Sequence, residues 1–154
     1  MIRIKRHFHT LVALLLIGLS HPLQAGNDRL LMMRSTQSFP EAMLALQKTI
    51  GEYGYTISRV QRVDIGLTSS GFATDKYRIV FFGKPEEVRH LSEKYPQLIP
   101  YLPLKITLFA EQEETLLTTF DPEILTAIAS DELFRAQAMR WRSDIIAIFD
   151  ELRE

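Results

Sequence analysis

The chain has 154 residues, 46% of them hydrophobic, and a formal net charge of −1 from 18 basic and 19 acidic side chains. This charge balance argues against a nucleic-acid partner, because binding phosphates requires a clustered positive field. The chain has no cysteine, which excludes disulfides and a lipoprotein anchor and leaves stability to the hydrophobic core.

Residues 1–25 have the three-part pattern of a cleavable secretory signal peptide. Three basic side chains precede an unbroken apolar run at 11–19, and the small residue Ala25 suits cleavage before Gly26. A helix of that apolar run would span about 14 Å, whereas a hydrocarbon core is about 30 Å thick, so an uncleaved anchor is the weaker interpretation. We expect a periplasmic or secreted protein that is free of the membrane after cleavage.

Cleavage would change the composition of the chain. The number of Lys and Arg side chains falls by three to 15 while the 19 acidic side chains stay, which gives a net charge of about −4. His90 is then the one histidine left. Residues 26–154 have the length of a single domain.

The sequence of the first half of this domain predicts two strands and a helix. Residues 30–34 are typical of a strand. Between 39 and 53 apolar side chains recur at steps of three and four, behind a capping box that begins at Ser38, which predicts a helix. The β-branched and aromatic stretch 55–63 predicts a second strand, and the glycines and serines of 64–75 favour turns.

The second half predicts three further strands and one long helix. The expected elements are a strand at 77–82, a helix at 85–94, an apolar loop with three prolines at 95–103, a hairpin of strands 104–110 and 115–120, a short helix after Asp121, and a final helix at 131–152. The resulting order β-α-β-β-(α)-β-β-α indicates an α+β fold, with an antiparallel sheet and helices packed on one of its faces.

Four short stretches of this sequence together resemble a known family. They are the run YRIVFFGKP from Tyr77 to Pro85, Leu-Pro-Leu-Lys at 102–105, Phe-Asp-Pro at 120–122, and Val-Asp at 63–64. In this order they resemble the bacterial "domain of unknown function 302" family over residues 30–125. The resemblance implies a TATA-binding-protein-like α+β fold that is often dimeric, and it implies no reaction. Where many members have Asp-His, this chain has Asp64 followed by isoleucine.

The usual catalytic and metal-binding patterns are missing from residues 26–154. One histidine and no cysteine cannot supply a zinc or copper site, so we expect neither a metal nor another cofactor. His90 stands among charged residues, as expected of a solvated side chain, and no strand-elbow serine motif accompanies it. Asp64 is a candidate for carboxylate chemistry only because acidic residues are common.

The second face of the predicted sheet is the best candidate for a binding surface. Strand periodicity puts Arg78 and Phe82 on one side of their strand, and Lys105 and Phe109 on the polar-aromatic side of theirs. We predict that these four side chains lie on one outward sheet face, which meets solvent, a partner or a ligand. Tyr101 lies nearby in the proline-containing loop. The candidate binding residues are Asp64, Arg78, Phe82, Tyr101, Lys105 and Phe109.

Three functions remain open at this point. The leading hypothesis is an exported, non-enzymatic module that binds a periplasmic protein, a small molecule or a second copy of itself through the outward sheet face and the proline-containing loop 95–103. The alternatives are a cofactor-independent enzyme with carboxylate chemistry near Asp64 and a carrier that holds an apolar ligand under Trp141.

The signal peptide gives a first prediction. Because Ala25 follows the apolar run at the spacing of a cleavage site, the exported protein should begin at Gly26. Intact-mass measurement of the purified protein checks this. Membrane-bound protein that retains residues 1–25 would contradict it.

Overall fold

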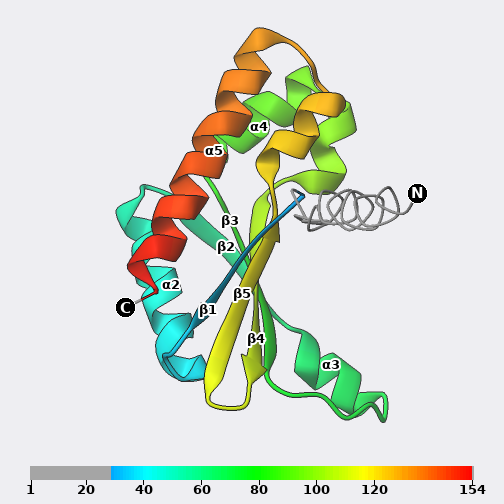
Figure 1. The fold of residues 1–154 in the computed structure, drawn as a ribbon. Helices are drawn as coiled ribbons and strands as arrows, with labels where there is room; N and C mark the ends of the chain where they lie inside the picture. The colour runs from blue at the N-terminus through cyan, green and yellow to red at the C-terminus, as the bar shows by residue number, and fades with distance from the viewer. Residues whose placement is uncertain (1–28, 154) are drawn as a thin grey trace, which may run out of the picture.

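A five-stranded antiparallel sheet is the framework of the computed structural model, which describes residues 29–153 (Figure 1). The predicted signal peptide and its cleavage site, Ala25 and Gly26, lie outside these residues. The strands are β1 (Leu30–Ser35), β2 (Thr56–Arg62), β3 (Tyr77–Gly83), β4 (Leu104–Glu111) and β5 (Glu114–Phe120). Their order in the sheet is β1-β5-β4-β3-β2, which confirms the predicted α+β class.

Helices cover one face and one end of this sheet. They are α2 (Phe39–Glu52), α3 (Val63–Ser69), α4 (Pro85–Lys94) and α5 (Glu132–Glu151), with the 3₁₀ helices η2 (Pro96–Tyr101) and η3 (Pro122–Ala127). Figure 1 shows α2 and α5 along one side of the sheet, α4 at its upper end and α3 projecting from its lower end. Within the described residues, no helix has the length and apolar character to cross a bilayer.

The local signals for helix starts behave as predicted. The Glu41 carboxylate accepts a hydrogen bond from the Ser38 backbone N–H at 3.0 Å, which forms the capping box of α2. Asp131 accepts from the Phe134 N–H at 3.1 Å and so caps α5, and Asp121 caps η3 in the same way. Each cap satisfies a backbone donor that the helix itself leaves without a partner.

The segment predicted as turns contains the short helix α3 instead. Its hydroxyl side chains satisfy carbonyls of the preceding turn: Thr68 donates to the carbonyl of Asp64 at 2.7 Å, and Ser70 to that of Gly66 at 3.0 Å. Such local bonds usually compete with helix formation, but here they lie within the helix and at its end. No residue of α3 is buried, so hydrophobic periodicity could not reveal the helix.

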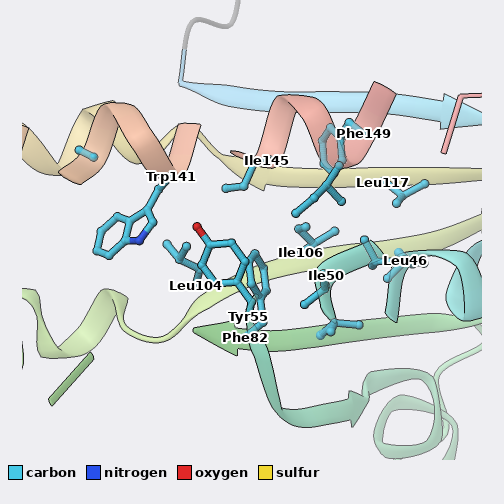
Figure 2. Packing of buried hydrophobic residues seen from close by; sticks show 14 of the residues in the cluster. Leu46, Ile50, Tyr55, Phe82, Leu104, Ile106, Leu117, Trp141, Ile145 and Phe149 are labelled. Atoms are coloured by element: carbon cyan, nitrogen blue, oxygen red, sulfur yellow. The ribbon is translucent and has the colours of Figure 1, made fainter. Parts of the chain in front are cut away.

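The core lies between the sheet and helices α2 and α5. Figure 2 shows Trp141, Ile145 and Phe149 of α5 facing side chains from α2 and the sheet. The end of α5 closes over this core, because the Ser35 hydroxyl donates to the Leu152 carbonyl at 2.8 Å and both residues are fully buried. This bond ties the end of α5 to β1, the edge strand at the other end of the chain.

Phe82 faces this core, and the prediction that it lies on the outward face is wrong. Its side chain is fully buried and packs edge-on against the Tyr55 ring, with 5.4 Å between ring centroids (Figure 2). The register places Val80 opposite Ile106 and Phe82 opposite Leu104, so these residues share the helix-covered face. β3 is apolar on both faces, so its sequence alone cannot show which one is covered.

The two adjacent phenylalanines of β3 provide a direct test of this assignment. Truncating the fully buried Phe82 to alanine should lower the free energy of unfolding by about 3–5 kcal/mol, because it leaves a cavity. Phe81→Ala, on the opposite face, should lower the free energy of unfolding by less than about half as much as Phe82→Ala. The reason is that the Phe81 side chain is already partly exposed to water. Urea denaturation of both variants checks the prediction. Equal losses, or a larger loss for Phe81→Ala, would contradict it.

Candidate functional site

The sheet face opposite the helices is a candidate binding surface, and we call it the open face. Strand alternation and the pairing registers arrange it in three rows that cross the strands. These rows are Arg34, Leu116, Phe109 and Tyr77; then Met32, Thr118, Thr107, Ile79 and Gln61; then Leu30, Phe120, Lys105, Phe81 and Arg59. Among residues 29–153, none of the side chains of this face is among the buried residues of the core, although Phe120 packs against them.

Apolar side chains dominate the open face, and its charges stand mostly at its margins. Met32 is 49% exposed, although it is a large apolar side chain, and the rings of Tyr77 and Phe109 meet edge-on at 6.0 Å. At one corner the Arg34 guanidinium Nε contacts a Glu111 carboxylate oxygen at 2.8 Å. A sheet face of this composition is typical of a contact surface for another protein.

The structure does not bring the six predicted binding residues together. Lys105 and Phe109 lie on the open face as predicted, and the Lys105 ammonium stands 5.8 Å from the centroid of the Phe120 ring. Tyr101 ends η2 with 37% of its surface exposed. Arg78 lies on the helix side of β3, opposite Leu108, so its predicted outward orientation is also wrong. Arg78 and Phe82 are four residues apart in β3 and therefore point to the same face, so the same ambiguity of an apolar strand explains both errors.

Arg78 and Asp64 nevertheless meet in a shielded ion pair. The Arg78 guanidinium contacts the Asp64 carboxylate, with only 14% and 13% of the two side chains exposed. The guanidinium also stands 5.8 Å from the centroid of the Phe39 ring at the start of α2. The hydrogen bond from Arg78 holds the pKa of Asp64 below its usual value, and the opposite charge adds to this effect. The carboxylate therefore stays ionised at neutral pH and anchors α3 to β3.

A small apolar pocket lies beyond the Lys105 row, where β2, β3 and α4 meet. Its volume is about 270 Å³, and its lining residues are Thr56, Ser58, Gly83, Pro85, Val88 and Pro103. Gly83 is required for this packing, because a Cβ atom there would stand 2.8 Å from Cγ2 of Val88. The Gly-Lys-Pro and Leu-Pro stretches, which lie apart in the sequence, thus converge on one pocket.

A polar network links α4, α5 and the start of β2 on the helix side. The Tyr55 hydroxyl donates to the Asp144 carboxylate at 2.5 Å, and Arg140 contacts both Asp144 and Glu87. The Trp141 indole N–H donates to Glu87 at 2.9 Å. Burial raises the pKa of the Tyr55 phenol, and the hydrogen bond to Asp144 raises it further. A phenol held protonated suits a structural link between elements better than an acid–base role.

The side chains behind the two alternative hypotheses are occupied with packing and pairing. Asp64 is committed to Arg78, and its lowered pKa is the opposite of what a general acid needs. Trp141 is 1% exposed and packs edge-on against Phe134 at 6.1 Å, so it fills the core. Residues 29–153 contain no group of three or more His, Asp or Glu side chains placed to hold a metal ion.

Sequence reasoning missed most of the open face and the whole pocket. The predicted outward orientation of Arg78 and Phe82 implies that Tyr77, Ile79 and Phe81 face the helices, whereas the structure places them on the open face. A strand with apolar residues on both faces gives no signal that could correct this. The pocket had a partial signal, because Gly83 and Pro103 belong to the stretches that carry the family resemblance. The network of Arg140, Asp144 and Glu87 had no sequence signal except the four-residue spacing of Arg140 and Asp144 in α5.

Comparison with known proteins identifies the family. Residues 31–152 match the family described as Domain of unknown function DUF302, and the chain belongs to it. A crystal structure of an uncharacterized conserved protein DUF302 from Bacillus stearothermophilus has the same fold, with a TM-score of 0.72 and 17% sequence identity. The similarity covers 80% of this chain and 98% of that one. None of the functionally curated proteins matches this sequence.

The ion pair of Asp64 and Arg78 gives a prediction about pH. The folded-state pKa of Asp64 is lowered, so its stabilising contribution is complete above the unfolded-state pKa of about 4 and is lost as the pH falls through the folded-state value. Asp64→Asn should therefore reduce the free energy of unfolding at pH 7 by on the order of 1 kcal/mol.

This difference from the wild type should shrink toward pH 3, where Asp64 becomes protonated. Urea denaturation across this range measures it, and Asp75→Asn, at an exposed aspartate without an ion pair among the described residues, is the control. A difference between Asp64→Asn and wild type that stays constant down to pH 3 would show that the ion pair does not cause it.

Proposed function

We propose that this protein is an exported, non-enzymatic binding module of the periplasm or the secreted fraction, and that its open face docks a second copy of the same chain. The observation that carries the proposal is a five-stranded sheet with one face covered by helices and the other lined with apolar side chains. The signal-peptide pattern of residues 1–25 supports export.

The size of the open face suits a modest dimer. Strands lie about 4.8 Å apart and rise about 3.3 Å per residue, so five strands of about six residues present roughly 480 Å² in each copy. Two such faces give about 960 Å², which is close to the roughly 1,000 Å² expected of a specific interface. Because a two-fold dimer uses the same patch on both copies, the patch must complement itself. A mostly apolar face with an internally paired corner, Arg34 with Glu111, meets that requirement.

The oligomeric state tests this proposal. The wild-type protein should sediment as a dimer at tens of micromolar, the range of a weak dimer. Phe109→Glu should give a monomer with an unchanged circular dichroism spectrum, because it places two like charges in an apolar interface. Met32→Glu should do the same, and its side chain is already 49% exposed, so the fold tolerates the change.

Leu44→Glu is the matched control, because Leu44 is an apolar side chain on α2 with 71% exposure and lies away from the open face. It should leave the dimer intact. A wild-type monomer throughout this concentration range, or dimers that survive both open-face substitutions, would refute the proposed dimer.

A further inference from the structure

The outer edge of β2 is a second candidate surface, which borders the open face at Arg59. β2 is the last strand of the sheet, so in the described residues one side of its backbone has no neighbouring strand. Four of its seven side chains are exposed. An edge of this kind presents backbone N–H and C=O groups to which an extended peptide can add as a further strand.

The pocket at Gly83 lies directly beside this edge. Thr56 and Ser58 of β2 form one wall, Pro85 and Val88 of α4 form another, and Gly83 is the partner of Thr56 in the sheet. Its volume of about 270 Å³ is below the range of about 300–1,000 Å³ found for small-molecule sites. The pocket therefore suits one apolar side chain that is delivered along the edge strand.

The charge of the edge indicates the chemistry of its partner. Arg59 and Arg62 are exposed and form no ion pair with any residue between 29 and 153, whereas most other described arginines contact a carboxylate. The register places Arg59 opposite Phe81 on the open-face side and Arg62 opposite Arg78 on the helix side. The edge strand therefore carries a positive charge on each face of the sheet.

These arginines also argue against a second copy as the occupant of this edge. Pairing of β2 with β2 across a two-fold axis would bring arginines of both copies together, and like charges on paired strands destabilise them. The bulge between Ile57 and Arg59 further disturbs a regular strand-to-strand match. An acidic strand from a different protein avoids the like charges. It can pass the bulge as β3 does, because Phe81 and Phe82 of β3 pair with Arg59 and Ile57 and leave Ser58 without a partner.

We propose that β2 binds an extended, acidic segment of another protein as an added antiparallel strand, with one apolar side chain of that segment in the pocket. The register then defines the ligand. Acidic residues stand opposite Arg62 and Arg59, three positions apart. The apolar residue stands opposite Thr56 and only two positions further along, because the bulge gives β2 one extra residue between Arg59 and Ile57. The predicted motif is Glu-x-x-Glu-x-Leu, read from the N-terminus of the bound segment.

A synthetic peptide tests this motif directly. The probe is the N-acetylated, C-amidated peptide Thr-Glu-Thr-Thr-Glu-Thr-Leu-Thr, titrated into the ¹⁵N-labelled exported protein. Saturable chemical-shift changes should appear in β2 and at Gly83 and Val88, and amide hydrogen exchange should slow along the outer edge of β2. Slower exchange at these amides distinguishes strand addition from simple charge attraction. Replacing the leucine of the peptide with alanine should weaken binding severalfold.

Charge reversal supplies the matched variants. The double variant Arg59→Glu with Arg62→Glu should bind the acidic peptide roughly tenfold more weakly and should prefer a peptide with lysine in place of both glutamates. Arg135→Glu, at an exposed arginine of α5 that has no ion pair among the described residues, should bind as the wild type does. Absence of saturable shifts at about 1 mM peptide, or binding without slower exchange in β2, would overturn the proposal. The titration can be repeated on Met32→Glu, so a failed dimer and a failed peptide site remain separate results.

Discussion

The pairing of β3 with β4 is the constraint on which the rest of this structure depends. Val80 stands opposite Ile106 and Phe82 opposite Leu104, and these four side chains form the floor of the core under α2 and α5. Because successive residues of a strand point to opposite faces, this register also sends Tyr77, Ile79 and Phe81 to the open face. A slip of one residue would exchange the two sets. The same few pairs therefore determine both the stability of the fold and the surface available for binding.

The helix side uses its polar groups to hold elements together. Glu87 of α4 accepts from the Trp141 indole and pairs with Arg140, while Asp144, one turn later in α5, accepts from Tyr55 at the entry to β2. At the opposite end of the sheet, Asp64 and Arg78 perform the same task for α3. Such half-buried groups are stable because each has a partner. Their protonation states follow from those partnerships: an ionised Asp64 and a protonated Tyr55 contribute to structure, and neither is adjusted for proton transfer near neutral pH.

The two proposed binding surfaces rely on different physical interactions. The open face offers area and hydrophobicity, which suit a broad contact between rigid surfaces. The edge of β2 offers backbone hydrogen-bonding groups, two arginines without carboxylate partners in the described chain, and a pocket with room for one side chain. It therefore suits a narrow, extended ligand.

The sequence by itself determined the α+β class, the extent of most elements and the family, because these depend on local signals. The capping box at Ser38, the apolar spacing of the two long helices and the proline after Gly83 are readable from neighbouring residues. It also placed Lys105 and Phe109 on the correct face, since β4 is clearly amphipathic. Only the tertiary structure decided the orientation of β3, the pairing of Asp64 with Arg78, the helical state of α3 and the pocket at Gly83. Each of these depends on contacts between segments that are distant in sequence or on a helix with no buried face, and a local pattern contains no information about either.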